Sequence, residues 1–510
     1  DNSYHVVTLL PLAEDIVLDG FTITGGAARW TPTVPGSTRG GGLRASWVRD
    51  VRLSHLRIAN NRADYAAGVY LDGYTHADND RRWPFHVTME DVIVVGNVGQ
   101  DSGGGIYAQH RVSSGAPTGS DYSSLTLRRV LVADNAATRG SAEGGGLFVE
   151  AALTVEDSVF VDNGDADEAP YSGGQIASGE ENRGPLTIRN TAFLVGRARR
   201  GAGLFVGGGA IDALISRSSF LDHRTRDQGA ALMVSPEDFE ARTLRIEHSD
   251  FRHNVMWGGG DAGASTLFTL EETALTVVNS SFSRNRAPHV TATGRFTVRA
   301  DYDNPRAAFV NCSFFDNHGG WQGGINRYSS PSTAATPAFV RNSTFFRNEE
   351  GEMSNARTWR YPNDDAEFDH NCLEPDSYSG RLLSSNLTFT TADPFETGTA
   401  SGELFLAPGS APCLGAGRNA HAEAEGLDWR ALTTRADLSV PSLSTIDTGR
   451  HYDPGHPVVD TFGDDGTHLT WTTRQATECL LVDFDGSRPR FAWDVALDED
   501  GSGGHPAVAG

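Results

Sequence analysis

The chain has 510 residues, 58 of them glycine, and its 66 acidic against 42 basic side chains give a formal net charge of −24. This excess of negative charge repels phosphate backbones, so we expect no nucleic-acid partner, and no apolar run reaches the ~18 residues of a membrane-spanning helix. Arginine supplies all the Lys-plus-Arg charge, which excludes mechanisms that need a lysine nucleophile, Schiff base or P-loop.

A six-residue block recurs along the chain at intervals of about 31 residues. Each copy has an apolar middle and most copies end in Asn, as in VLVADN ending at Asn135 and SVFVDN ending at Asn163. The first copy ends at Asn61 and the last at Asn348. A near-periodic series of this length indicates an internal structural repeat.

Two further short segments accompany most blocks. An alternating segment such as LTVED precedes the block, and a glycine cluster with an apolar pair, such as GGGLF ending at Phe148, follows it. Each repeat therefore holds three short segments of period 2, and none shows a helical period. The sequence predicts an all-β right-handed parallel β-helix, a solenoid with three short strands in each coil of about 31 residues.

The composition of the repeat also predicts how a coil is built. Inward Val, Ile, Leu and Phe should fill a narrow core, and the clustered glycines should lie where a Cβ would clash. The Asn that ends each block is expected to form a tight corner, because Asn tolerates the left-handed region of backbone conformation. Stacked Asn side chains can then hydrogen-bond along the axis.

The paired GG-apolar and apolar-x-x-Asn motifs resemble the repeats of chlamydial polymorphic outer-membrane proteins and related bacterial surface proteins with a pectin-lyase-like β-helix. The segments DNSYHVV and LDGFTITGG (residues 18–26) resemble inner coils of large secreted members. TADPF, LAPGSAPCLGAG (406–417) and IDTGRHYDP (446–454) resemble their C-terminal cap. The resemblance implies a β-helix over residues 1–455, capped at about 390–455, in an extracellular or cell-surface bacterial protein. It also implies coils before DNSYHVV, so we expect a processed or truncated N-terminus.

Residues 456–510 are expected to form a β-rich extension. The stretch HLTWTTRQATECLLVDFDGS (468–487) resembles the opening strands of a small immunoglobulin-like module, and ALDEDGSGG (496–504) is better explained as a solvated acidic tail than as a calcium loop. The four cysteines are too few for a disulfide framework. Either Cys372 and Cys413 pair near the end of the main domain, or all four are buried thiols.

The strand after each glycine cluster predicts a binding face. Its first apolar residue should point inward and the next outward, so one outward column comprises Tyr70, Tyr107, Phe148 and Phe205. A polar column beside it comprises Asp72, Gln109 and Glu150, and His110 completes the candidate ligand-binding set. Rings about 4.8 Å apart beside hydrogen-bonding side chains are typical of a carbohydrate groove. The alternative is that the loops 74–86 and 110–124 bury the rings as a second small core.

Acidic residues also gather on the turn before the glycine cluster, namely Asp64, Asp101, Glu143, Asp165, Asp167 and Glu168. Stacked coils could bring some of them together, as a calcium site or a catalytic carboxylate pair requires. An acidic protein carries such residues on any turn, however. We therefore expect no firm metal site and no required cofactor, with calcium as the one candidate ion.

Two functions remain open at this point. The first is a non-enzymatic extracellular or cell-surface protein that binds a polysaccharide, a cell-surface glycan or another surface. The second is a polysaccharide lyase or glycoside hydrolase. Its candidate carboxylates are Asp72, Glu150, Asp101 and Glu143, and its candidate lyase bases are Arg111, Arg81 and Arg82. The surface-protein motifs favour the first function, and a spacer without any site is a third reading.

Overall fold

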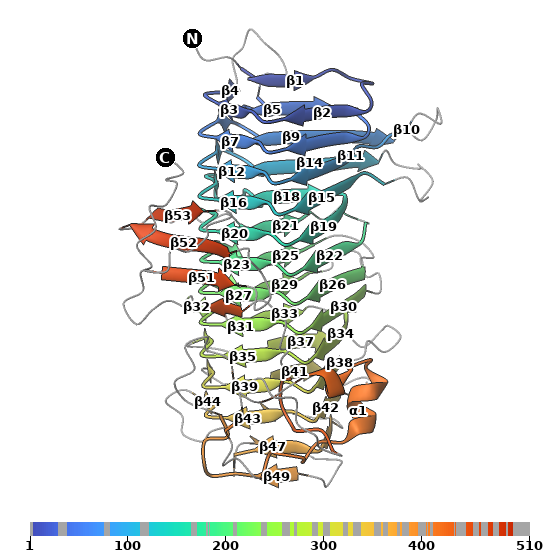
Figure 1. Cartoon of the computed structure of the whole chain (residues 1–510), viewed down its shortest axis with the longest axis vertical. Helices are drawn as coiled ribbons and strands as arrows, with labels where there is room; N and C mark the ends of the chain where they lie inside the picture. Colours follow the sequence, from blue (N-terminus) through green and yellow to red (C-terminus); the bar gives the residue numbers. More distant parts are fainter. Residues whose placement is uncertain are drawn as a thin grey trace.

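The computed structural model is a parallel β-helix whose short strands stack along one axis, from the blue N-terminal coils to the orange C-terminal ones (Figure 1). The predicted all-β fold class is confirmed. The structure describes residues 4–28, 38–75, 82–112, 122–164, 171–179, 182, 184–207, 212–235, 242–257, 266–269, 273–287, 294–298, 307–319, 325–329, 338–350, 359–360, 366–374, 378–379, 387–395, 404, 406–407, 412–432, 434, 445–451, 458–460, 468–472, 479–485 and 488–492.

Three long sheets form the walls of the solenoid. Sheet 1 contains, in spatial order, β1 (Val7–Leu9), β5 (Leu43–Ser46), β9 (Val69–Thr75), β14 (Ile106–Val112), β18 (Leu147–Glu150), β21 (Ile176–Ser178), β25 (Leu204–Val206), β29 (Leu232–Val234), β33 (Leu267–Thr269), β37 (Gly294–Val298), β41 (Ile325–Ser329), β45 (Trp359–Arg360) and β48 (Tyr378–Ser379). Sheet 2 contains β2 (Ile16–Asp19), β6 (Val51–Ser54), β11 (His86–Glu90), β15 (Ser124–Arg128), β19 (Ala152–Glu156), β22 (Leu186–Arg189), β26 (Asp212–Ser216), β30 (Arg242–Glu247), β34 (Thr273–Val278), β38 (Ala307–Val310), β42 (Ala338–Arg341) and β46 (Ala366–Asp369). Sheet 3 contains β3 (Thr22–Thr24), β7 (Arg57–Ala59), β12 (Ile93–Val95), β16 (Leu131–Ala133), β20 (Val159–Val161), β23 (Ala192–Leu194), β27 (Ser219–Leu221), β31 (Asp250–Arg252), β35 (Ser281–Ser283), β39 (Ser313–Phe315), β43 (Thr344–Phe346), β47 (Asn371–Leu373) and β49 (Leu387–Phe389). Apart from the added antiparallel strand β10 (Arg82–Trp83) on β9, the described pairings in these sheets are parallel.

Two ladders of very short strands lie between sheet 3 and the next strand of sheet 1. The first ladder is β4 (Ala27–Ala28), β8 (Arg62–Ala63), β13 (Val98–Gly99) and β17 (Ala136–Ala137). The second is β24 (Arg197–Arg200), β28 (Arg224–Gln228), β32 (Val255–Met256), β36 (Arg286–Ala287), β40 (His318–Gly319) and β44 (Glu349–Glu350). Three main strands per coil therefore form the walls, as the repeat predicts. The strands of the two short ladders add a fourth segment to the coils that contain them.

The core is the continuous interior of the coil stack. Inward residues of all three sheets form one buried cluster that runs from Ile23 to Leu373. In sheet 3 the central inward residue is Phe from β20 to β43, and successive rings stack parallel at 4.3–5.2 Å between centroids from Phe160 to Phe345. Because neighbouring parallel strands are about 4.8 Å apart, one ring per coil gives this spacing directly. The predicted Val, Ile, Leu and Phe core is confirmed.

The Asn at the end of each block forms a buried ladder along the axis. Asn61 donates from Nδ2 to Asn97 Oδ1 at 3.0 Å, and Asn97 donates to Asn135 Oδ1 at the same distance. The same bonds recur from Asn254 to Asn348. The prediction that these Asn residues themselves adopt the left-handed conformation is wrong. The preceding residue does so, for example Asn60 at φ 55° and Asp134 at φ 50°, because the ladder Asn must turn its amide inward.

The ladder is interrupted in two adjacent coils, where Gly196 and His223 replace Asn. The side chain of Gln175 fills the space beside Gly196, and Asn163 donates to Gln175 Oε1 at 2.5 Å. The imidazole of His223 accepts at Nδ1 from the backbone N–H of Gly196 at 2.9 Å. His223 is fully buried, and among the described residues its Nε2 has no hydrogen-bond partner.

The clustered glycines lie where neighbouring coils come closest. A Cβ on Gly26 would lie 1.8 Å from the carbonyl oxygen of Gly41, and one on Gly104 would lie 2.3 Å from that of Ala136. These contacts are with backbone and cannot be relieved by a rotamer change. The glycines are thus required by the close approach of the coils, as the sequence predicts.

A segment from 412 to 451 runs back along the outside of the coils instead of only closing their end. It contains α1 (Asn419–Ala424) and the short 3-10 helix η1 (Trp429–Ala431), which packs Trp429 beside Val278. Corner Asn side chains bind its backbone: Asn279 accepts from His451 N, and Asn342 accepts from Arg418 N at 2.8 Å. We call residues 412–451 the flanking segment.

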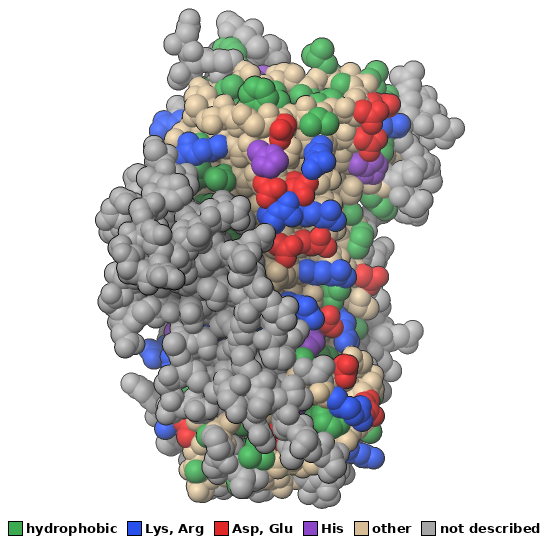
Figure 2. All heavy atoms as spheres, in the orientation of Figure 1, with side chains coloured by type: hydrophobic (Ala, Val, Ile, Leu, Met, Phe, Trp, Pro, Cys, Tyr) green, Lys and Arg blue, Asp and Glu red, His purple; other side chains and the backbone are tan. Residues whose placement is uncertain are grey.

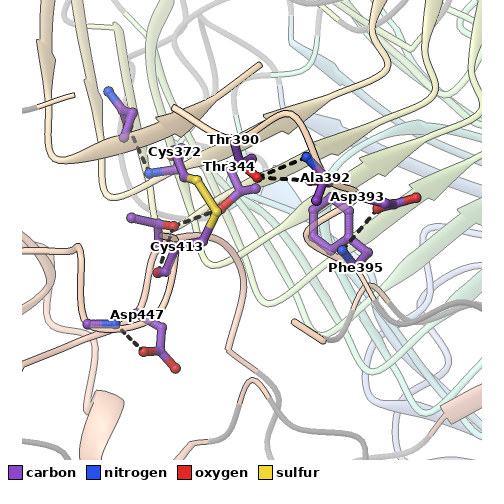
Figure 3. Close-up of a disulfide and its surroundings, with 12 residues drawn as sticks. Thr344, Cys372, Thr390, Ala392, Asp393, Phe395, Cys413 and Asp447 are labelled. Carbon is purple, nitrogen blue, oxygen red and sulfur yellow. Dashed lines mark hydrogen bonds between the residues drawn. A yellow bond between two sulfur atoms is a disulfide. The ribbon is translucent and has the colours of Figure 1, made fainter. Parts of the chain in front are cut away.

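A disulfide joins the flanking segment to the coil stack. Cys372 in β47 is bonded to Cys413, with 5.5 Å between their Cα atoms (Figure 3). The half-cystines lie in a small apolar cluster with Phe346 and Phe395. Of the two alternatives for the cysteines, the paired one is therefore confirmed for Cys372 and Cys413, and Cys312 is a buried free thiol.

The last described strands form a separate antiparallel sheet of β50 (Val458–Asp460), β51 (His468–Thr472), β52 (Cys479–Asp485) and β53 (Arg488–Ala492). This is β structure in the predicted extension, and β51 and β52 fall within the stretch that resembles an immunoglobulin-like module. The acidic stretch 496–504 lies outside the described residues.

One face of the solenoid carries acidic and basic side chains in alternation (Figure 2). Along sheet 2 and its corner, ion pairs between neighbouring coils include Arg52–Glu90 at 2.8 Å, Arg129–Asp91 at 2.7 Å and Arg128–Glu156 at 3.1 Å. Such exposed pairs contribute at most about 1 kcal/mol each. In each of these pairs the charges of the two coils offset one another. Within the described part of the chain, no helix is long and apolar enough to span a membrane.

Candidate functional site

Among the described strands of sheet 1, the two longest lie in neighbouring coils. β9 and β14 are seven residues long, β10 pairs antiparallel with the end of β9, and the neighbouring strands β5 and β18 have four residues. The register aligns the outward positions of Tyr70, Tyr107 and Phe148 in one row. A second row aligns Asp72, Gln109 and Glu150, and a third places Tyr74 beside Arg111. The predicted columns therefore exist at these coils. We call this widened outer face of sheet 1, at β5, β9, β10 and β14, the ledge.

The aromatic column itself is buried. The exposed fractions are 1% for Tyr70, 9% for Tyr107, 5% for Phe148 and 6% for Phe205. Tyr70 stacks on Tyr107 at 5.6 Å, and Tyr107 on Phe148 at 4.8 Å. The rings form a second small core, which is the arrangement that the sequence left as the alternative to an open groove. The column is also not continuous, because Ala177 lies between Phe148 and Phe205 in register.

A polar network covers the two tyrosines of this column. Arg39 Nη1 donates to the Tyr70 hydroxyl at 2.8 Å, and the Tyr107 hydroxyl donates to Gln109 Oε1 at 3.0 Å. Gln109 Nε2 donates to Glu150 Oε2 at 2.6 Å. Burial raises the pKa of both tyrosines, so their hydroxyls stay protonated and able to donate. Three of the four predicted polar and acidic candidates of this face, Asp72, Gln109 and Glu150, thus lie together.

Asp72 is the most unusual member of the network. Burial raises the pKa of its carboxyl, against the opposing attraction of Arg111, Arg39 and the Tyr70 hydroxyl. Its Oδ1 is buried and has no hydrogen-bond partner among the described residues; Arg111 Nε lies 3.7 Å away. Although burial works in the other direction, the charge of Asp72 raises the pKa of Arg111. This makes Arg111 a poor general base. Arg81 and the side chain of Arg82 lie outside the described residues.

Beside the network is an aromatic stack that the sequence did not predict. Trp47 lies 5.6 Å from Trp83, and Trp83 lies 6.3 Å from Tyr74, with all three rings close to parallel. Trp47 is 40% exposed, whereas the predicted rings are buried. Trp47 follows β5 with φ 58°, a conformation that disfavours a bulky side chain. Among the described strands of the three walls, β10 is the one that pairs antiparallel, so the repeat pattern could not reveal this stack.

His110 has a different environment from the rest of the predicted set. It points into the coil, where its Nδ1 lies 2.6 Å from Ser123 Oγ and its Nε2 lies 3.0 Å from Thr75 Oγ1. Burial lowers the pKa of His110 to about 4. Inward orientation follows from the alternation along β14, since Gln109 next to it points outward. A neutral imidazole with both nitrogens engaged is a structural element of this coil.

The acidic turn residues that the structure describes do not form a group of three potential metal ligands. Arg139 Nη1 lies 2.5 Å from Asp101 Oδ1, and Glu143 uses its backbone N–H to donate to Ser102 Oγ at 3.3 Å. Asp165, Asp167 and Glu168 lie outside the described residues. Within the described part of the chain, the one group of three potential metal ligands is elsewhere, at Asp369, His370 and His421. In the turns that the structure describes, the acidic residues considered as a candidate calcium site do not form such a group.

Comparison of the chain with protein-family models finds no match, and comparison with curated protein sequences finds no significant match. The resemblance to bacterial surface proteins therefore stays a resemblance of motifs. The function has to be argued from the residues of the ledge.

Proposed function

We propose that this protein binds an extended polysaccharide or cell-surface glycan on the outer face of sheet 1, at β5, β9 and β14. The observation that carries the proposal is the stack of the exposed Trp47 on the half-buried Trp83 and Tyr74, beside the polar network. Aromatic faces pack against the apolar face of a sugar, and polar side chains next to them bind its hydroxyls.

The buried aromatic rings and the polar side chains above them have different roles in the proposed site. The buried rings of Tyr70 and Tyr107 support the network from below, because they are packed and their hydroxyls are already engaged. Arg111, whose side chain is 39% exposed, and Asp72 beside it lie at the level that a ligand can reach. Within each row, equivalent positions of successive coils repeat every ~4.8 Å, which favours a ligand that extends along the axis.

The disulfide supports the proposed location. Structural disulfides persist in oxidising compartments and are rare in the cytosol. A bond between Cys372 and Cys413 is therefore consistent with an extracellular or cell-surface protein, as the resemblance to bacterial surface proteins implies. We propose an adhesin-like binding role in which the stacked coils act as a rigid support for the ledge.

Replacing Trp47 by Asn should weaken polysaccharide binding about fivefold, because one stacking contact of this kind is worth roughly 1 kcal/mol. Asn suits the positive φ at this position, so the backbone should be retained. The measurement is retardation in affinity electrophoresis on a panel of neutral and uronic-acid polysaccharides. The matched control is Trp257→Asn, since Trp257 is 62% exposed and lies several coils away. Equal retardation of wild type and Trp47→Asn, or no retardation on any polysaccharide, would contradict the proposal.

A glycoside hydrolase is the second candidate function, and the raised pKa of Asp72 is the observation that favours it. A carboxyl with a raised pKa holds its proton more readily than an ordinary aspartate, which suits it to act as general acid. Asp72 and Glu150 are two strands apart, so their backbones are separated by roughly 9.6 Å, and a pair of carboxyl groups at about 6.5–9.5 Å is typical of inverting enzymes.

If the protein is a hydrolase, Asp72→Asn and Glu150→Gln should each reduce cleavage of the retained polysaccharide by at least about a hundredfold, the typical contribution of general acid–base catalysis. Mass spectrometry of the products would measure this and would also detect the unsaturated ends of a lyase. The control is Glu156→Gln, in β19 of sheet 2, where this side chain pairs with Arg128 away from sheet 1. Retention without any shortening of the polysaccharide would rule out both enzymatic readings and leave the binding role.

A further inference from the structure

Three potential metal ligands meet where the flanking segment contacts the last coils. Asp369 is the final residue of β46, His370 follows it at the corner, and His421 lies in α1. Their ligand atoms all lie within 4.8 Å of one another. Because the two histidines are 51 positions apart in the sequence, only the fold brings them together.

The geometry of the group is close to that of a metal centre. His421 Nε2 lies 2.6 Å from Asp369 Oδ2, and His370 Nδ1 lies 2.8 Å from Asp369 Oδ1. The two imidazole rings are edge to face, with 5.6 Å between their centroids. Zn–N and Zn–O bonds of about 2.0–2.1 Å in a tetrahedral site place donor atoms roughly 3.3 Å apart. Side-chain movements below an ångström would therefore fit the three donors around one ion.

Hydrogen bonds within the described structure do not satisfy the buried ring nitrogen of His370. Its Nδ1 is buried, and despite the short distance to Asp369 it makes no hydrogen bond within the described structure. A buried nitrogen without a hydrogen bond is costly unless another partner binds it. His370 also has φ 54°, at a corner where the three preceding coils carry Asn. At this corner, a histidine that can bind a metal ion thus takes the place of the Asn side chain of the preceding coils.

The surroundings contain both favourable and opposing groups. Asp369 and His421 are buried, so solvent competes little for their ligand atoms. Arg418 Nη1 lies 4.0 Å from Asp369 Oδ2, and Arg341 is the register neighbour of Asp369. The side chain of Arg418 is 57% exposed, so it can turn to solvent when a cation binds.

We propose that Asp369, His370 and His421 bind one Zn²⁺ ion, with water in the fourth position. Two imidazoles and one carboxylate are a typical zinc ligand set, whereas calcium prefers six to eight oxygen ligands. The ion would link α1 to the end of β46. The site is distinct from the proposed glycan-binding ledge and does not depend on its function.

The test is titration of the full-length protein, first treated with a chelator, with Zn²⁺ in a calorimeter and with Co²⁺ in a spectrophotometer. We expect one saturable site per chain and the visible absorption of tetrahedral Co²⁺. His370→Asn should lower the affinity at least tenfold, because it removes one ligand and leaves the His421–Asp369 hydrogen bond in place. Asn should fold normally at this corner, as it does at Asn342.

The matched control is His55→Asn, because His55 occupies the same type of corner with φ 49° near the other end of the solenoid. It should bind Zn²⁺ like the wild type. Absence of a saturable site in the wild type, or equal affinity in wild type and His370→Asn, would overturn the proposal. Equal losses in the two variants would do the same, since they would indicate scattered surface histidines.

Discussion

Replacing Arg450 by Ala should destabilise the protein by about 3–5 kcal/mol, the usual result of removing one partner from a buried ion pair. Arg450 lies in the flanking segment, and its Nη1 contacts Asp250 Oδ1 in β31 and Ser281 Oγ. Both charged side chains are largely buried, at 8% and 14% exposure. Burial by itself would raise the pKa of Asp250, but Arg450 and its neighbours hold that pKa below its usual range. Without Arg450, a buried carboxylate would lose its counter-charge.

The expected loss would be measured as the free energy of unfolding in urea. The control is Arg128→Ala, which removes an exposed pair with Glu156 and should cost less than about 1 kcal/mol. A double variant, Arg450→Leu with Asp250→Asn, should recover part of the stability, because it leaves no unpaired buried charge. If Arg450→Ala changes stability no more than Arg128→Ala, the flanking segment is not held by this ion pair.

Acidification should destabilise the wild type more than a His223→Asn variant, by about 2 kcal/mol at pH 5. Burial lowers the pKa of His223 to about 3, whereas the unfolded chain should titrate near 6.5. The folded state therefore binds fewer protons, and stability falls as the pH decreases from about 6.5 towards 3. The slope is about 1.4 kcal/mol per pH unit in this window. An Asn at this position does not titrate, so the variant should lack that contribution.

The measurement is the unfolding free energy of both proteins at pH 7 and at pH 5. Both pH values are needed because other buried histidines contribute to the pH dependence of stability in each protein. At pH 7 we expect the two to agree within about 1 kcal/mol, since an Asn oxygen can accept from Gly196 N as ladder Asn residues do elsewhere. His86→Asn, at an exposed histidine, is the control. An unchanged difference between pH 7 and pH 5 in His223→Asn would show that His223 does not carry the effect.

The ledge differs in structure from the rest of the solenoid. We assign the proposed binding to the ledge and a supporting role to the other coils. The later coils repeat with uniform short strands and a continuous Phe stack, whereas the long strands β9 and β14 occur at the ledge. Function in such a fold resides in departures from the repeat, because the repeat itself fills the interior and leaves no cavity. The exposed Trp47 and the buried, incompletely paired Asp72 are both departures of this kind.

The amino-acid sequence by itself determined the repeat and its consequences. Period-2 segments, glycine clusters and terminal Asn residues were sufficient to predict the all-β solenoid, its apolar core and the Asn hydrogen bonds along the axis. The outward register of Tyr70, Asp72 and Gln109 also followed, because alternation along a strand is a local property.

Only the tertiary structure decided which of these outward residues a ligand can reach. Burial of the Tyr70 and Tyr107 rings depends on what packs over the sheet, and the alternation along one strand carries no information about it. The stack of Trp47 on Trp83 joins residues that share no repeat position. The meeting of Asp369 with His421 depends on the path of the flanking segment outside the solenoid. Periodicity determines contacts between neighbouring coils, whereas contacts made by non-repeating segments depend on where the folded chain carries them.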